Sequence, residues 1–412
     1  MIYRKERKAP GSRGIHAWSA QRPGAFDLSS RRKRRWWWRI GALSLVLVPM
    51  GGALYGYVRL RQSPYAAIEA AREALMQARA TQAERYAASL WEQAQRSWNQ
   101  ALAQWQEANQ RWWAWQQYTQ VQAVARQAEQ QAWAAARRAE QVRDSLHQQS
   151  TQLLHELTPR LDSLSQWLEA LPYRSAWNQQ LQEAQTHYRT ARKALENGDL
   201  WGAAGQAAEA HQRLNELEQQ VRDYVQHYLK ALPTWQQWVE EARQEARRSG
   251  SLLLVVEKIA RRCYVYRGAQ HIATFTVELG PNWMGPKLYA GDRATPEGRY
   301  RVIRKLGPGE TRYYRALLLD YPNAADRTRF DQARREGRLP PNARIGGLIE
   351  IHGEGGRGVD WTEGCVALRN EEMRQLFELV PVGTPVVIVG ALEPPGWLTS
   401  RLKGNLTASY GR

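Results

Sequence analysis

The composition of the chain changes abruptly near residue 250, and this change constrains the fold more than any other feature. From Pro64 to about Arg248 the sequence is rich in Ala, Gln, Glu, Arg and Trp and poor in β-branched residues, which favours helices. Beyond Gly250 it consists of short apolar runs separated by Gly and Pro, which is typical of strands and turns. A chain of 412 residues can hold two or three domains. We therefore predict an α+β multidomain protein.

A seven-residue repeat of tryptophan marks the helical segment, which we place at residues 64–248. The repeat consists of Trp91, Trp98, Trp105 and Trp112, and the positions three residues later hold Ala94, Ala101, Ala108 and Trp115. This spacing is that of a helix-packing seam, and small Ala opposite large Trp lets helices interdigitate. A tryptophan stripe can also stack on sugar rings, but the period favours a core.

Helix-breaking residues divide this segment, and we predict an elongated antiparallel bundle of about four to seven helices. The breaks are expected at Pro159, Pro172 and Pro233. Asn197-Gly198-Asp199 indicates a helix stop followed by an N-cap.

The amino-terminal part combines positive charge with an apolar stretch. Residues 1–39 contain twelve Lys and Arg against two acidic residues, so more than half of the net charge of +18 lies in this tail. No motif that reads DNA or RNA accompanies it, so we expect no nucleic-acid partner. Residues 40–58 contain no charge and have about the length of a membrane helix. The preceding basic run and tryptophans predict an uncleaved membrane anchor with a cytoplasmic amino terminus. A cleavable signal peptide is the alternative, but no Ala-x-Ala site follows.

Seven apolar runs after Gly250 predict strands. They are Leu252–Val256, Cys263–Tyr266, Ile272–Val277, Tyr300–Val302, Ala316–Leu319, Leu348–Ile351 and Pro385–Val389. One short helix is expected at residues 371–379, capped by Asn370. We therefore predict a mostly β, sandwich-like domain at residues 251–390, followed by an irregular tail at 391–412.

A histidine and a cysteine in this domain form a candidate acyl-transfer site. His352 ends an apolar run and precedes Gly353, and Cys365 follows Gly364. A thiolate can attack a carbonyl, an imidazole can lower the thiol pKa and shuttle protons, and the N–H groups of Gly364 and Cys365 can hold an oxyanion. The alternative is that Cys365 is a buried small hydrophobe and His352 a core histidine.

The remaining cysteine and histidines indicate no second site. Cys263 lies in a predicted strand, and we expect free thiols at both cysteines because a bond between them would block the candidate nucleophile. Five histidines are scattered through the helical segment without metal-ligand spacing, so we expect no metal.

Four stretches of the C-terminal domain, in this order and spacing, resemble the catalytic domain of the L,D-transpeptidases (YkuD-type domains). They are Leu252–Lys258 with Cys263–Gly268, Gly291–Tyr300, Leu319–Asp326, and His352-Gly353 with Thr362–Asn370. The form Thr362-Glu363-Gly364-Cys365-Val366-Ala367 is similar to a subgroup that includes an enzyme hydrolysing the link between murein and its lipoprotein. Many family members have a second histidine where Glu363 stands, and Arg or Asn where Ala367 stands.

The resemblance implies a cysteine enzyme acting on peptidoglycan stem peptides without a cofactor. Cys365 would be the nucleophile and His352 the proton shuttle, oriented by the backbone of Gly353, with Gly364 at the oxyanion. The candidate substrate-binding residues are Arg357, Thr362, Arg369 and Asn370. The acyl-enzyme would pass to an amine, as in a transpeptidase, or to water, as in an endopeptidase or carboxypeptidase. A non-catalytic envelope scaffold is an alternative of another class, supported by the missing second histidine.

The resemblance also implies a location. Peptidoglycan lies outside the inner membrane, so we expect a single-pass inner-membrane protein with a periplasmic catalytic domain. The helical segment would then be a stalk or a docking surface for another envelope protein.

Overall fold

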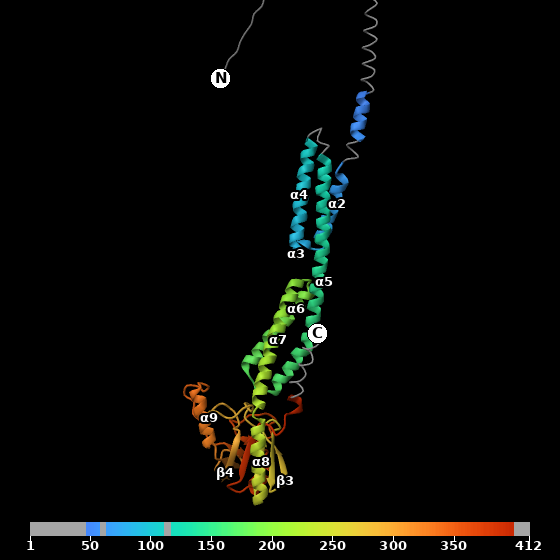
Figure 1. Ribbon diagram of the computed structural model, residues 1–412. Helices are drawn as coiled ribbons and strands as arrows, with labels where there is room; N and C mark the ends of the chain where they lie inside the picture. The colour runs from blue at the N-terminus through green and yellow to red at the C-terminus, as the bar shows by residue number, and fades with distance from the viewer. Residues whose placement is uncertain (1–46, 58–62, 111–116, 399–412) are drawn as a thin grey trace, which may run out of the picture. The chain divides into compact units, whose positions relative to one another are not determined.

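The computed structural model describes residues 47–57, 63–110 and 117–398, which divide between two compact units, Met1–Val142 and Arg143–Arg412 (Figure 1). Residues 47–57 are helical, whereas the other residues of the expected membrane span at 40–58, and the whole basic tail at 1–39, lie outside the described residues. Among the residues that are described, no helix is both long enough and apolar enough to cross a membrane. The membrane anchor therefore stays a prediction.

The first unit is held together by alanine faces of its helices. It contains α2 (Tyr65–Ala80), α3 (Ala83–Tyr86), α4 (Ala88–Gln110) and the first part of α5 (Tyr118–Ala170). Ala94 and Ala101 of α4 are fully buried, and Trp98 and Trp105 pack against the core cluster that contains Ala101 while staying partly exposed. The alanine positions of the repeat are thus confirmed as core, and small side chains allow close approach of the helix backbones. Trp112 and Trp115 lie outside the described residues.

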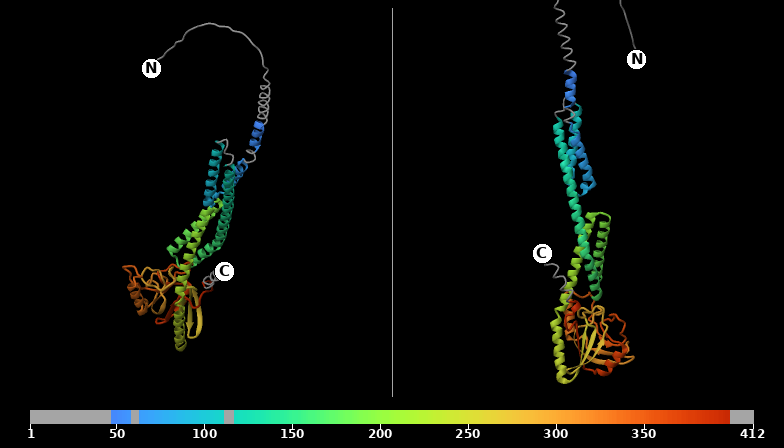
Figure 2. Two further views of the ribbon diagram at one scale, coloured as in Figure 1. Left: turned by 45° about the horizontal axis from the view of Figure 1, so that its top comes forward. Right: turned by 90° about the vertical axis from the view of Figure 1, so that its right-hand side faces the viewer.

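The helices of the second unit pack around larger side chains. The rest of α5 is followed by α6 (Ser175–Glu196), α7 (Leu200–Leu229) and α8 (Leu232–Ser249). Leu157 of α5 and Leu214 and Leu217 of α7 are completely buried in one core cluster. Figures 1 and 2 show α6 and α7 side by side.

The helix boundaries test the predicted breaks. Asp199 caps α7 by accepting from Gly202 N–H at 3.2 Å, and Gly198 has a φ of +74°, as the stop and N-cap signal predicted. Pro233 lies in the first turn of α8, and Pro172 lies between α5 and α6. The break expected at Pro159 is wrong, because this residue lies inside α5. Leu157 and Leu161 on either side of it are buried, so tertiary packing outweighs the lost backbone hydrogen bond.

The β-rich part of the second unit forms one sheet with the strand order β3-β2-β1-β8-β4-β5-β6-β7. The strands are β1 (Leu252–Glu257), β2 (Arg262–Arg267), β3 (Gln270–Thr276), β4 (Gly298–Leu306), β5 (Ala316–Leu319), β6 (Glu350–His352), β7 (Val366–Ala367) and β8 (Pro385–Val389). Every predicted run overlaps a strand of the structure, and β7 is an additional strand that was not predicted.

The predicted sandwich of two sheets does not form, because β4 pairs with strands of both halves and joins them into one sheet. Its first residues pair with β8, and those from Val302 onward pair with β5. An irregularity in the register of the β5 pairing lies between Val302 and Arg304, just after the β8 pairing ends at Arg301. A long strand with such an irregularity can bend and so remain part of both halves.

Two helices accompany the sheet. The helix predicted after the candidate nucleophile is α10 (Asn370–Leu379), with Arg369 rather than Asn370 at its N-cap position. Helix α9 (Ala324–Arg335) was not predicted, although Asn323 and Asp326 form a capping box at its start.

Helix α8 lies against the sheet and shares its core. Trp235 of α8 is 1% exposed and meets Tyr228 of α7 edge to face, with ring centroids 4.9 Å apart. A Cβ at Gly390 would lie 2.2 Å from the Trp235 ring, so only glycine admits the indole there. The end of α7 and the β-rich part of the chain are therefore one packed body within this unit.

A buried polar network connects α7 to the β-rich part of the chain. Lys258 is fully buried, and its Nζ donates to Glu297 at 2.8 Å and to two backbone carbonyls at 2.7 Å. Tyr228 of α7 donates to the same carboxylate at 2.9 Å. Burial raises the pKa of Tyr228, and the Glu297 carboxylate adds to the rise.

Candidate active site

Strands β6 and β7 bring the predicted catalytic pair to one edge of the sheet. They pair in parallel with His352 opposite Ala367, so Cys365 lies just before β7 and beside Glu350. The Glu350 N–H donates to Cys365 Sγ at 3.4 Å. His352 therefore ends β6 and Cys365 directly precedes β7, so both residues lie at the β7 edge of the sheet.

The turn before β7 is fixed by hydrogen bonds and by a glycine. Thr362 Oγ1 donates to Cys365 O at 2.7 Å and accepts from Gly364 N–H at 3.2 Å. Gly364 has a φ of +126°, and a Cβ there would lie 2.6 Å from Ala294 O, so a larger residue does not fit. The Gly364 N–H, predicted to hold an oxyanion, donates to Thr362 in this structure, and its role in catalysis stays a prediction.

A buried ion pair supports the same turn from behind. Lys287 Nζ lies 2.7 Å from Asp292 Oδ1 and donates to Glu363 O at 3.2 Å. The side chain of Glu363 is 62% exposed and lies 3.5 Å from Arg293. The backbone of Glu363 thus helps to hold the turn before β7, while its carboxylate is largely exposed to solvent.

The thiol of Cys365 is uncharged in this environment at neutral pH. Burial raises the pKa of Cys365 to about 11, and the negative charge of Glu350 acts in the same direction. The Glu350 N–H and the positive charges of Arg312 and Lys287 oppose the rise. Ionisation of this thiol therefore has to accompany substrate binding or proton transfer.

The imidazole of His352 is held by its own neighbour and by aromatic rings. Its Nδ1 lies 2.5 Å from Gly353 O, which places the proton on Nδ1 because a carbonyl only accepts. Tyr313 stacks on the ring with centroids 3.5 Å apart, and Trp361 meets it edge to face at 5.9 Å. Nε2 is buried and has no hydrogen-bond partner among the described residues.

Burial lowers the pKa of His352 to about 4, and the positive charges of Arg312 and Arg357 act in the same direction. The hydrogen bond to Gly353 opposes this change. A neutral imidazole with a free lone pair on Nε2 can accept a proton.

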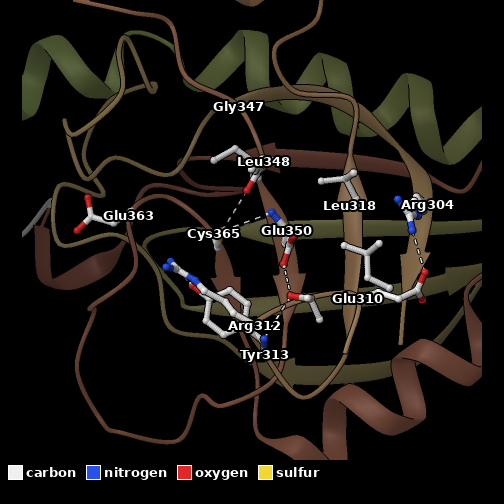
Figure 3. A pocket seen from close by; sticks show the side chains of 13 residues that line it. Arg304, Glu310, Arg312, Tyr313, Leu318, Gly347, Leu348, Glu350, Glu363 and Cys365 are labelled. Atoms are coloured by element: carbon white, nitrogen blue, oxygen red, sulfur yellow. Dashed lines mark hydrogen bonds and ion pairs between the residues drawn. The ribbon is translucent and has the colours of Figure 1, made fainter. Parts of the chain in front are cut away.

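A cavity of about 540 Å³ opens beside the thiol (Figure 3). It is lined by Arg304, Leu306, Glu310, Thr311, Arg312, Tyr313, Leu318, Gly347, Leu348, Ile349, Glu350, Glu363 and Cys365. These residues come from β4, β5, β6, the segment before β5, the segment before β6 and the nucleophile turn. The cavity is large enough for part of a peptide and mixes charged with apolar groups.

The four predicted substrate-binding residues do not line this cavity. Arg357 lies over the Trp361 ring at 3.5 Å, and Thr362 is the buried support of the turn. Arg369 occupies the N-cap position of α10. Asn370 accepts from Glu354 N–H at 2.8 Å and so holds the loop after His352.

Several residues of the site were not predicted. Arg312 and Tyr313 belong to a segment without a recognised motif, and Glu350 was read only as part of an apolar strand. The sequence did hold a signal for Glu350, which stands two residues before His352. Residues two apart on a strand face the same side, so the two side chains could be expected on one face.

Both cysteines are free thiols, and Cys263 is fully buried in β2. Across the described ranges, no cluster of three or more His, Cys, Asp or Glu side chains is arranged to hold a metal ion.

The C-terminal part of the chain matches a known family. Residues 252–388 match the family model of YkuD, the L,D-transpeptidase catalytic domain. The resemblance seen in the sequence motifs is thereby confirmed for this segment, which contains both Cys365 and His352.

Curated proteins of the same family are similar to parts of the chain. The putative L,D-transpeptidase YafK of Escherichia coli (strain K12) is 29% identical over 119 residues, which are 28% of this chain and 41% of that protein. The putative L,D-transpeptidase YqjB of Bacillus subtilis (strain 168) is 33% identical over 102 residues, which are 24% of this chain and 53% of that protein. The chain thus spans about half or less of the length of these relatives.

Solved structures similar to this chain include an L,D-transpeptidase from Mycobacterium smegmatis, with 16% identity and a TM-score of 0.21, covering 33% of this chain and 58% of that one. Another is an L,D-transpeptidase from Xylanimonas cellulosilytica, with 14% identity and a TM-score of 0.23, covering 34% of this chain and 60% of that one.

Proposed function

We propose that this protein is a membrane-anchored cysteine L,D-transpeptidase that acts on peptidoglycan stem peptides through an acyl-enzyme on Cys365. The observation that carries the proposal is the placement of His352 at the end of β6 and of Cys365 directly before the neighbouring strand β7, with Cys365 lining a cavity, within the segment that matches the family. The acyl donor would be the carbonyl of the L-centre of diaminopimelate, next to a D-residue.

In the first half-reaction the sulfur of Cys365 attacks this carbonyl carbon, and the thiol proton passes to Nε2 of His352. The bond to the D-residue then breaks, and its nitrogen leaves with the proton from the imidazole. The product is a thioester on Cys365. Because both groups are neutral at rest, proton transfer and attack have to be coupled.

In the second half-reaction an amine attacks the thioester carbonyl, a new amide forms, and the thiol of Cys365 is restored. With water in place of the amine the product is a carboxylate, and the enzyme is a hydrolase. The Cys365 N–H is the candidate oxyanion donor of the turn, and such a donor is worth on the order of 2.7–4 kcal/mol in known hydrolases.

The membrane anchor is supported by the sequence pattern of a basic run followed by an uncharged stretch at 40–58. It would place the catalytic domain in the periplasm. Recovery of the full-length protein in the membrane fraction after a carbonate wash is the expected result. Recovery in the soluble fraction would contradict the anchor.

The activity is tested with the full-length protein in detergent micelles, purified stem tetrapeptides and mass spectrometry. We expect peptides joined through a new amide, together with a covalent adduct on Cys365, and we expect neither with Cys365→Ala. Products of water addition alone would identify a hydrolase. No adduct and no turnover would favour the non-catalytic scaffold.

A further inference from the structure

The cavity beside Cys365 contains two charged groups without an ion-pair partner among the described residues. Glu350 is 8% exposed, and its carboxylate accepts only from the Thr311 hydroxyl, at 3.0 Å. Arg312 donates to the Tyr313 hydroxyl at 2.9 Å, and its guanidinium lies 5.0 Å from the centre of that ring. Figure 3 shows both side chains at the thiol.

The other charged side chains that line the cavity each lie near an opposite charge, and Glu363 lies 3.5 Å from Arg293. Arg304 lies 2.8 Å from Glu310, and Figure 3 shows this ion pair at the far side from Cys365. The carboxylate of Glu350 and the guanidinium of Arg312 are therefore the charges that a ligand next to the nucleophile would meet.

An unpaired carboxylate in a largely buried position costs free energy, which a cationic ligand would recover. A guanidinium favours a carboxylate, with which it forms charge-assisted hydrogen bonds. Together the two groups match a ligand that carries both an ammonium and a carboxylate, as an α-amino acid does.

We propose that Glu350 and Arg312 are the residues that select the acyl acceptor in this cavity, with Glu350 holding the ammonium group and Arg312 the carboxylate of an α-amino acid. The inference rests on the proposed function, since an acceptor has a role only after an acyl-enzyme has formed. A site for an ammonium group favours transfer of the acyl group to an amine over its transfer to water.

The charges also account for the proton transfers of aminolysis. An ammonium ion cannot attack, so the Glu350 carboxylate takes its first proton and leaves a neutral amine. The amine nitrogen then bonds to the thioester carbon, the carbon–sulfur bond breaks, and the sulfur of Cys365 leaves with the electron pair. The second amine proton passes through His352 to this sulfur, and the third stays on the new amide. Glu350 finally returns its proton to solvent.

The electrostatic environment of Glu350 favours its role as the base that takes a proton from the ammonium group. Burial raises the pKa of Glu350, with the Thr311 hydrogen bond and Arg312 opposing, which makes the carboxylate a stronger base than an exposed one. Its charge also raises the pKa of Cys365. A cation bound at Glu350 removes this penalty and makes the thiolate a better leaving group.

The test measures how the acyl-enzyme divides between amine and water. Full-length protein in detergent micelles receives a stem tetrapeptide as donor and either glycine or glycinamide as acceptor, and mass spectrometry gives the ratio of amide to hydrolysis product. We expect Glu350→Gln to lower this ratio at least tenfold with both acceptors. Arg312→Gln should lower it with glycine, which has a carboxylate, and not with glycinamide. Glu336→Gln, at the end of α9 and outside the cavity, should keep the wild-type ratio.

Imipenem separates this inference from the proposed function. A covalent adduct of imipenem on Cys365 in Glu350→Gln shows that the variant is folded and has a working nucleophile. If the wild-type protein forms an adduct with neither the donor nor imipenem, the proposed function fails and this inference with it. If adducts form and Glu350→Gln keeps the wild-type ratio, or the wild type transfers only to water, the inference fails alone.

A measurement on the wild-type protein needs no variant. N,N-dimethylglycine carries an ammonium and a carboxylate but cannot form an amide, so it should compete with glycine and slow aminolysis without slowing formation of the acyl-enzyme. N-acetylglycine lacks the ammonium and should not compete. Equal inhibition by both compounds would refute a site for the ammonium group.

Discussion

Alkylation of Cys365 should depend on pH as for a buried neutral thiol, not as for a thiolate–imidazolium pair. Burial raises the pKa of Cys365 from an ordinary 9.0 to about 11, and burial lowers the pKa of His352 to about 4. Across the neutral range the thiol therefore keeps its proton and the imidazole carries no charge. The thiolate fraction should rise about tenfold for each pH unit until the pH approaches the thiol pKa.

The pKa difference sets the size of the effect. At pH 7 a thiol of pKa 9 is ionised in about one molecule in 100, and a thiol of pKa 11 in about one in 10,000. A thiolate of higher pKa is also more nucleophilic, with a Brønsted slope of about 0.4–0.5, which returns a factor of about six to ten. Cys365 should therefore react about 10- to 16-fold more slowly than an ordinary cysteine at pH 7, before any steric hindrance.

The assay follows iodoacetamide labelling of Cys365 by mass spectrometry between pH 6 and pH 10, with N-acetylcysteine as the reference thiol. Cys263 is fully buried and burial raises its pKa to about 12, so Cys365→Ala supplies the background. A rate that rises steadily with pH is expected. A labelling rate that stays constant between pH 6 and pH 8, or labelling faster than the reference, would show a preformed ion pair and refute the reasoning.

Three substitutions test the supports of the site. Gly364→Ala should abolish turnover and lower the free energy of unfolding by about 1–3 kcal/mol because its φ is positive; wild-type turnover would contradict the tight turn. Trp235→Ala should lower the free energy of urea unfolding by about 3–5 kcal/mol, because the indole is buried. The matched Trp201→Ala, at a half-exposed position, should change it by less than about 0.5 kcal/mol. Lys258→Met should cost about 3–5 kcal/mol by leaving the Glu297 carboxylate without its cation, and adding Glu297→Gln should recover part of this loss. Additive losses would show that the two groups are not coupled.

Local patterns predicted the elements that depend on neighbouring residues. The switch at Gly250, the turn at Asn197-Gly198-Asp199 and the strands of the β-rich part all follow from composition, capping residues and turn residues. The candidate catalytic pair could be found for the same reason, since His352 and Cys365 each lie beside a glycine in a recognisable motif.

Predictions from local sequence patterns were wrong or incomplete where contacts with residues distant in the sequence determine the structure. Pro159 breaks a helix by local rules, yet buried leucines on both sides keep α5 continuous. Thr362 and Asn370 were candidates for substrate binding from the family resemblance, and the structure shows that each also holds a loop through a hydrogen bond.

The sequence by itself determined which elements form, and that a thiol and an imidazole are available for acyl transfer. Only the tertiary structure decided which side chains surround them. The cavity draws on segments near residues 304–313, 347–350 and 363–365, which meet because β4, β5, β6 and β7 are neighbours in the sheet. The same packing sets the charge state of the pair, since burial is a property of the assembled domain and both pKa shifts arise from burial.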